Sequence, residues 1–137
     1  GECTAICPHG AIPIRWATKP EVIQIKTAEC ALAALAGKRD AVGFLNCMIN
    51  ITPDCDCCDW NDPPFVADVG FTASLDPVAV DVASADLVAA GAVSPGSVAD
   101  GGPEDPWRAI VDTDYRVIFS HGEAIGLGRR DYELIRL

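Results

Sequence analysis

The sequence has no uninterrupted apolar run close to the roughly 18 residues that a membrane-spanning helix needs. It opens with no charged segment followed by an apolar one, which is the pattern of a secretory signal. The motifs G-x-x-x-x-G-K-[ST], G-x-G-x-x-G, G-x-S-x-G and H-E-x-x-H do not occur in it either. The phosphate-loop, dinucleotide, serine-hydrolase and zinc-protease classes therefore lose support, and we expect a cytoplasmic protein.

Positive charge is scarce. Ten Lys and Arg stand against twenty Asp and Glu, which gives a formal net charge of -10. From Asp40 to Trp107, both included, there is no Lys or Arg, although twelve Asp or Glu fall in that stretch. A chain of this charge repels nucleic acid and anionic lipid, so we expect neither as a partner. A hard cation, a basic partner surface or plain solvation would each neutralise the acidic stretch.

The length of 137 residues and the 50% hydrophobic content suit one compact domain. A domain of this size buries roughly 65–70% of the surface of its unfolded chain, so neither disulfides nor a metal is needed merely to hold the fold.

Seven cysteines lie at positions 3, 7, 30, 47, 55, 57 and 58. An odd number with three inside four residues is a poor layout for a disulfide framework. Clustered cytosolic thiols are more typical of metal ligands, cluster ligands or redox groups.

The N-terminal string Cys3-x3-Cys7-Pro8 matches the tail of the cluster-binding run C-x2-C-x2-C-x3-C-P. If the parent protein follows this run, two more cysteines precede Gly1, so we expect residues 1–13 to be a truncated ferredoxin-type motif. Two cysteines alone cannot ligate a complete [4Fe–4S] cluster. The alternative is a chance pair of cysteines.

The remaining chain, residues 14–137, is expected to form one α/β domain with a mixed sheet and about three helices. A short stretch of alternating polarity covers Glu21–Lys26. Helices are expected at Thr27–Gly37, from Val78 to about Ala90 with Asp76 as the N-cap, and at Tyr115–Gly126; buried strands are expected at Ala41–Ile51 and Phe65–Leu75, and a final strand at Tyr132–Leu137.

Three thiols and two carboxylates stand in the five residues Asp54-Cys55-Asp56-Cys57-Cys58, in a loop bounded by prolines. In an extended segment Cys55 and Cys57 face one way, while Asp54, Asp56 and Cys58 face the other. The thiols would suit a soft metal or a cluster, and a carboxylate would suit a hard cation or a proton. The alternatives are an Asx-rich turn with incidental thiols and a vicinal disulfide between Cys57 and Cys58.

Asp81 follows five residues after Asp76 on the expected helix, among apolar neighbours. It is either an inward-facing carboxylate that supports the cysteine loop or a solvated charge on the helix face. Cys30 and Cys47 are expected to be buried thiols that pack in a helix and a strand. The alternative for Cys47 is a fourth ligand presented near the end of its strand.

Taken together, four strings resemble the domain of unknown function 362 family, which is described as uncharacterised iron–sulfur centre proteins. They are Cys3-x3-Cys7-Pro8, Asn50-Ile-Thr-Pro-Asp-Cys-Asp-Cys-Cys58, Ser74-Leu-Asp-Pro-Val-Ala-Val-Asp81, and Ile125-Gly-Leu-Gly128 with Tyr132-Glu-Leu-Ile. The resemblance implies a parent with an upstream domain and an inserted ferredoxin-like module that binds a [4Fe–4S] cluster, with Cys3 and Cys7 among its ligands. It implies no particular reaction.

Three kinds of function remain open. The first is electron transfer through a [4Fe–4S] cluster, with the Asp54–Cys58 loop as a second iron, zinc or thiol site, and with redox proteins and the missing N-terminal part of the parent as partners. The second is a metal-dependent enzyme in which Asp56 or Asp81 acts as general base. The third is a structural zinc site or a metal-free domain.

Overall fold

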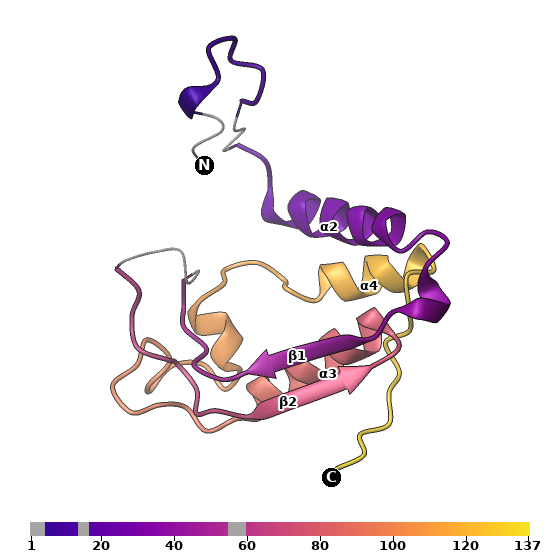
Figure 1. Cartoon of the computed structure of the whole chain (residues 1–137). Helices are drawn as coiled ribbons and strands as arrows, with labels where there is room; N and C mark the ends of the chain where they lie inside the picture. Colours follow the sequence, from indigo (N-terminus) through magenta and orange to yellow (C-terminus); the bar gives the residue numbers. More distant parts are fainter. Residues whose placement is uncertain (1–4, 14–16, 55–59) are drawn as a thin grey trace.

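A computed structural model describes residues 5–13, 17–54 and 60–137 (Figure 1). In chain order its helices and strands are α2 (Pro20–Ala34), the 3-10 helix η1 (Arg39–Ala41), β1 (Phe44–Met48), β2 (Gly70–Ser74), α3 (Pro77–Ala89), the 3-10 helix η2 (Pro106–Ala109) and α4 (Val117–Ala124). This confirms the α/β class and the expectation of about three helices. No helix in the described part of the chain is long and apolar enough to cross a membrane.

The two strands form an antiparallel pair in which Phe44 lies opposite Ser74 and Met48 lies opposite Gly70. The sheet of the described residues is this one pair, so the expected mixed sheet is not what these strands form. The apolar run around β1 predicts a strand that is buried on both faces. The structure instead exposes Leu45 to 64%, because only one face of the sheet is covered by α3 (Figure 1).

Helix α3 is the central element, because it contacts both strands, α4 and η2. Its start follows the sequence closely. The Asp76 side chain accepts the N–H groups of Val78 and Ala79, and Pro77 occupies the first helical position. Seven residues along α3 are buried: Val78, Ala79, Val80, Ala83, Ser84, Ala85 and Val88.

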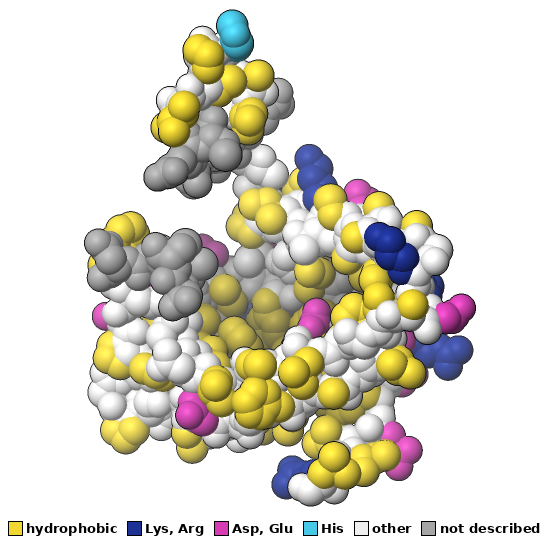
Figure 2. All heavy atoms as spheres, in the orientation of Figure 1, with side chains coloured by type: hydrophobic (Ala, Val, Ile, Leu, Met, Phe, Trp, Pro, Cys, Tyr) yellow, Lys and Arg dark blue, Asp and Glu magenta, His cyan; other side chains and the backbone are white. Residues whose placement is uncertain are grey.

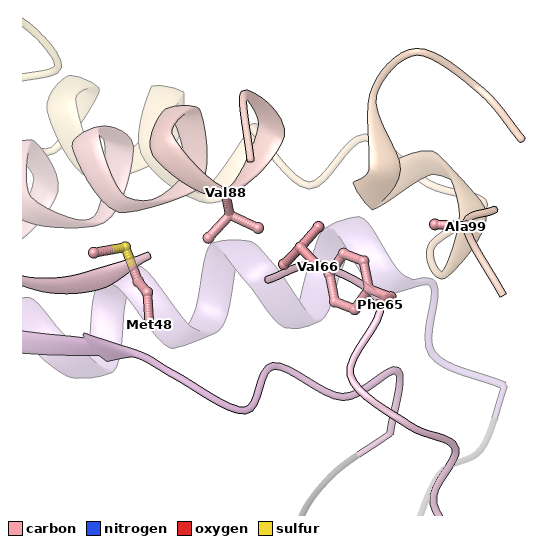
Figure 3. Packing of buried hydrophobic residues seen from close by; sticks show 5 residues of the cluster. All are labelled: Met48, Phe65, Val66, Val88 and Ala99. Atoms are coloured by element: carbon pink, nitrogen blue, oxygen red, sulfur yellow. The ribbon is translucent and has the colours of Figure 1, made fainter. Parts of the chain in front are cut away.

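One hydrophobic cluster lies below the C-terminal half of α3. Figure 3 shows Val88 pointing from α3 toward Val66 and Phe65, with Met48 and Ala99 at the two sides. Phe65 is 0% exposed, and its ring meets Trp107 edge to face with the centroids 5.5 Å apart. The cluster joins the end of β1 to the segment that follows α3.

Helices α2 and α4 lie side by side, and α4 also contacts α3 (Figure 1). A second cluster of buried residues, Ala28, Val78 and Leu127, joins α2, α3 and the segment just after α4. Gln24 also ties α2 to the start of α4, because its side chain donates to the Asp114 carbonyl (3.0 Å) and accepts the Ile118 N–H (3.2 Å).

Several boundaries differ from the expected ones. Residues Glu21–Lys26 belong to α2, which begins at Pro20 because proline suits the first turn of a helix. In the stretch Phe65–Leu75, only the second half forms β2, while Val66 makes an isolated bridge with Val93. The predicted final strand at Tyr132–Leu137 is wrong, since these residues have no regular structure.

Candidate functional site

The candidate site residues fall into two groups. Cys3, Cys55, Asp56, Cys57 and Cys58 lie outside the described residues. The structure does describe Cys7, Asp54 and Asp81, each in a different part of the fold.

Cys7 stands at the start of a tight turn. The Gly10 N–H donates to the Cys7 carbonyl (3.2 Å), and Gly10 takes a φ of 57°, which glycine adopts without strain. The turn brings the Ala11 N–H to the Cys7 Sγ (3.3 Å). This N–H, and after it the His9 N–H, lowers the pKa of the Cys7 thiol. The turn therefore favours the thiolate, which is the form of cysteine that binds metals.

This geometry fits a ligand of an iron–sulfur cluster. Cluster sulfurs commonly accept backbone N–H bonds, and those bonds help to set the reduction potential. Cys7 is only one thiolate, however. Among residues 5–13, 17–54 and 60–137, no three His, Cys, Asp or Glu side chains lie close enough together to hold a metal ion. A metal centre at Cys7 would need further ligands from residues outside these ranges.

Asn61 binds the residues that directly precede the cysteine-rich segment, residues 55–58. The Asn61 side chain donates to the Asp54 carbonyl (2.7 Å) and to Thr52 Oγ1 (2.8 Å), and it accepts the Asp54 N–H (3.1 Å). The residues just before Cys55 are thereby held next to a residue just after Asp59. The backbone of Asp54, rather than its carboxylate, makes these bonds, and the side chain of Asp54 is exposed.

Asp81 lies on α3 and its Oδ1 accepts a hydrogen bond from Asn46 Nδ2 on β1 (2.7 Å). The same nitrogen donates to Ser84 Oγ (3.0 Å), and Ser84 donates to the Val80 carbonyl (2.6 Å). Thr72 Oγ1 lies 2.7 Å from Ser84 Oγ. Because the single Ser84 proton goes to Val80, Thr72 is the donor in that pair. Asp81 is thus solvent-exposed, like a charge on the helix face, but it also binds the sheet through Asn46.

Sequence reasoning missed Asn46, Thr72 and Ser84. One signal was present, since Asn46 is a polar residue inside the apolar run of a strand, and a polar group in such a place needs a partner. The expectation that Cys30 and Cys47 are buried is wrong, because both are exposed free thiols. An apolar sequence neighbourhood does not tell which face of a helix or strand is covered.

One comparison with known proteins identifies a family. Residues 9–86 match the family model of DUF362, a domain of unknown function. The matched range starts two residues after Cys7 and contains Asn46, Asn61 and Asp81. Comparison with curated proteins and with solved structures found no match. Since the family match covers more than half of the chain, the chain belongs to the DUF362 family.

Proposed function

We propose that the chain is part of an iron–sulfur protein that transfers electrons, with Cys7 and Cys3 among the ligands of a [4Fe–4S] cluster. The turn at Cys7 carries this proposal, because its backbone N–H groups point at the one ligand sulfur that the structure describes. When bound, such a cluster takes up and releases single electrons. It requires four thiolates, so two ligands beyond this pair are needed.

Cys7 and the acidic chain would act on the cluster in opposite directions. An N–H bond to a ligand sulfur stabilises the more negative, reduced cluster and raises its potential. Nearby carboxylates favour the oxidised cluster, which carries less negative charge. With a net charge of -10 and no Lys or Arg between Asp40 and Trp107, the electron partner would be a redox protein with a basic docking surface.

A second iron, zinc or thiol site is proposed at Asp54, Cys55, Cys57 and Cys58. Its support is the hydrogen bonding of Asn61, which fixes the base of this segment. A loop whose ends are fixed loses less entropy when its thiols bind one ion.

Metal analysis of the chain tests both sites. A longer form of the protein, which includes the two cysteines expected before Gly1, is reconstituted without oxygen. Iron, acid-labile sulfide and zinc are then measured for the wild type, Cys7→Ser, Cys55→Ser/Cys57→Ser and Cys30→Ser. Cys30 is an exposed free thiol on α2, so Cys30→Ser is the matched control. We expect iron and sulfide in the wild type and in Cys30→Ser, and a loss of both in Cys7→Ser. Dithionite should bleach the visible absorbance and air should restore it.

Wild-type iron content in Cys7→Ser, or no iron in the wild type, would contradict the cluster proposal. Absorbance that does not respond to dithionite would contradict electron transfer. The double variant addresses the second site alone. If it keeps the full metal content, Cys55 and Cys57 do not bind metal. A loss of zinc only would identify a structural or hydrolytic zinc site there.

A further inference from the structure

A groove of about 450 Å³ lies between β1, α3 and α4. Figure 2 shows the molecule hollowed on this face, with hydrophobic side chains inside the hollow. The residues that line the groove come from all three elements and from the segment around η2. This volume is within the range of sites for small organic molecules, about 300–1,000 Å³.

The walls of the groove are mainly apolar. Trp107 and Phe119 supply aromatic surface, and Val88, Met48 and Ile51 supply aliphatic surface. The indole of Trp107 is held in place, because its Nε1 donates to the Ala85 carbonyl (3.1 Å) and its ring packs on Phe65. A flat apolar ligand would meet a wall that is already ordered, which reduces the entropy lost on binding.

The polar end of the groove presents acceptors. Asn46 uses both of its N–H groups, one on Asp81 Oδ1 (2.7 Å) and one on Ser84 Oγ (3.0 Å). Within the described residues, this leaves Asn46 Oδ1 and Asp81 Oδ2 without a hydrogen-bond donor. Tyr115 also lines the groove, but its hydroxyl proton goes to Asp105 Oδ2 (3.0 Å).

No positive side chain compensates the Asp81 carboxylate in the part of the chain that the structure describes. The Arg116 side chain is engaged elsewhere, with Asp86 (3.2 Å) and with the Tyr115 hydroxyl. A ligand that complements this end must therefore donate hydrogen bonds and carry positive charge.

We propose that this groove binds a small organic cation, with an aromatic or apolar body along Trp107 and Phe119 and an ammonium group that donates to Asp81 and Asn46. Cys7 is not among the residues that line this groove, and the proposal does not depend on the proposed cluster.

Calorimetry with three matched probes tests the charge requirement. Tryptamine is a cation, tryptophol replaces its amine by a hydroxyl, and indole-3-acetate is an anion of similar size. We expect tryptamine to bind about tenfold or more tightly than tryptophol, because a charge-assisted hydrogen bond contributes about 1.5–3 kcal/mol. Indole-3-acetate should not bind. Equal binding of tryptamine and tryptophol, or no binding of tryptamine at millimolar concentration, would overturn the proposal.

Two variants locate the site. Asp81→Asn keeps an acceptor for Asn46 but removes the charge, so it should weaken tryptamine about tenfold and leave tryptophol unchanged. Asp131→Asn changes the net charge equally and lies outside the groove, so it should leave tryptamine affinity unchanged. An equal loss in both variants would show that only the overall charge attracts the amine. Circular dichroism verifies that both variants fold.

Cys47 gives an independent measure of occupancy, because it lines the groove. Tryptamine should slow the alkylation of Cys47 by iodoacetamide, followed by peptide mass spectrometry. Cys30, which is exposed on α2, serves as the internal control and should react at an unchanged rate. If tryptamine binds but Cys47 and Cys30 react as before, the amine lies outside this groove and the proposal is wrong.

Discussion

The carboxylate of Asp76 packs directly against the backbone of Gly128. Asp76 Oδ1 accepts the N–H groups of Val78 (2.9 Å) and Ala79 (3.0 Å), and Oδ2 accepts the N–H of Arg129 (2.9 Å). One side chain thus begins α3 and also holds the segment that follows α4. Two strings that are far apart in the sequence, Ser74–Asp81 and Ile125–Gly128, meet at this point.

The first prediction concerns the space at Gly128. A Cβ at this position would overlap Asp76 Oδ1 and would also come within 3.0 Å of Val78 Cβ. Gly128→Ala must therefore displace a carboxylate that holds three N–H groups. We expect a loss of about 1–3 kcal/mol in the free energy of unfolding, measured by urea denaturation.

Gly43→Ala is the matched control. A Cβ at Gly43 would meet only Leu75 Cδ2 at 3.8 Å, which is ordinary contact, and Gly43 has no positive φ. It should change stability by less than about 0.5 kcal/mol. Equal effects of the two substitutions would show that the contact with Asp76 does not matter.

The second prediction concerns the same carboxylate as a helix cap. Asp76→Ala removes the acceptor for two N–H groups at the start of α3, so we expect a loss of about 1–2 kcal/mol in the free energy of unfolding. Asp76→Asn keeps an oxygen acceptor that caps helices well and should lose clearly less. A loss in Asp76→Asn as large as in Asp76→Ala would show that the charge or the Oδ2 bond to the Arg129 N–H, rather than the cap, stabilises this end.

Local signals made parts of the fold predictable. Asp76 before Pro77 predicts the start of α3, because the capping side chain and the proline act within one helical turn. Strand pairing depends on contacts between β1 and β2, which are separated in the sequence by the cysteine-rich segment. The apolar pattern of each strand alone therefore does not predict that the two pair antiparallel. The same limit explains why the strand predicted at Tyr132–Leu137 is absent. These residues favour a strand, but among the described residues no strand pairs with them.

The candidate site also has parts that the sequence predicts and parts that it does not. The Cys7 turn follows from adjacent residues, where Gly10 permits the positive φ that points the Ala11 N–H at the sulfur. The contact between Asn46 and Asp81 joins residues on a strand and a helix, so only the fold reveals it. The sequence therefore located the cysteine segments but not the groove.

The third prediction concerns the buried pair Thr72 and Ser84, which are 9% and 8% exposed. Ser84→Ala leaves the Thr72 hydroxyl without an acceptor at its position in the core, which costs about 1–3 kcal/mol. Thr72→Val alone leaves Ser84 bound to Asn46 and Val80, so its cost should be smaller. The double variant should cost less than the sum of the two, because neither hydroxyl is then left alone. Strict additivity in urea denaturation would contradict this coupling.

The fourth prediction concerns stability in acid. Arg130 donates its backbone N–H to Glu123 Oε1 (2.9 Å) and its Nε–H to Oε2 (2.7 Å). The backbone bond first, and then the side-chain bond, lowers the pKa of the Glu123 carboxyl from 4.5. A carboxyl whose pKa is lower in the folded state stabilises the fold above the unfolded pKa. That contribution is lost as the pH falls through the lowered folded value.

Glu123→Gln should therefore be less stable than the wild type at pH 7, and the difference should shrink as the pH falls below about 4.5. Because the pair is exposed, the difference is expected to be small and to decrease with added salt. Glu133→Gln is the control, since Glu133 makes no hydrogen bond or ion pair within the described residues. Thermal unfolding of the three proteins between pH 7 and pH 3 measures the effect. A difference that stays constant through this range would mean that the ionised carboxylate of Glu123 is not what holds the segment after α4.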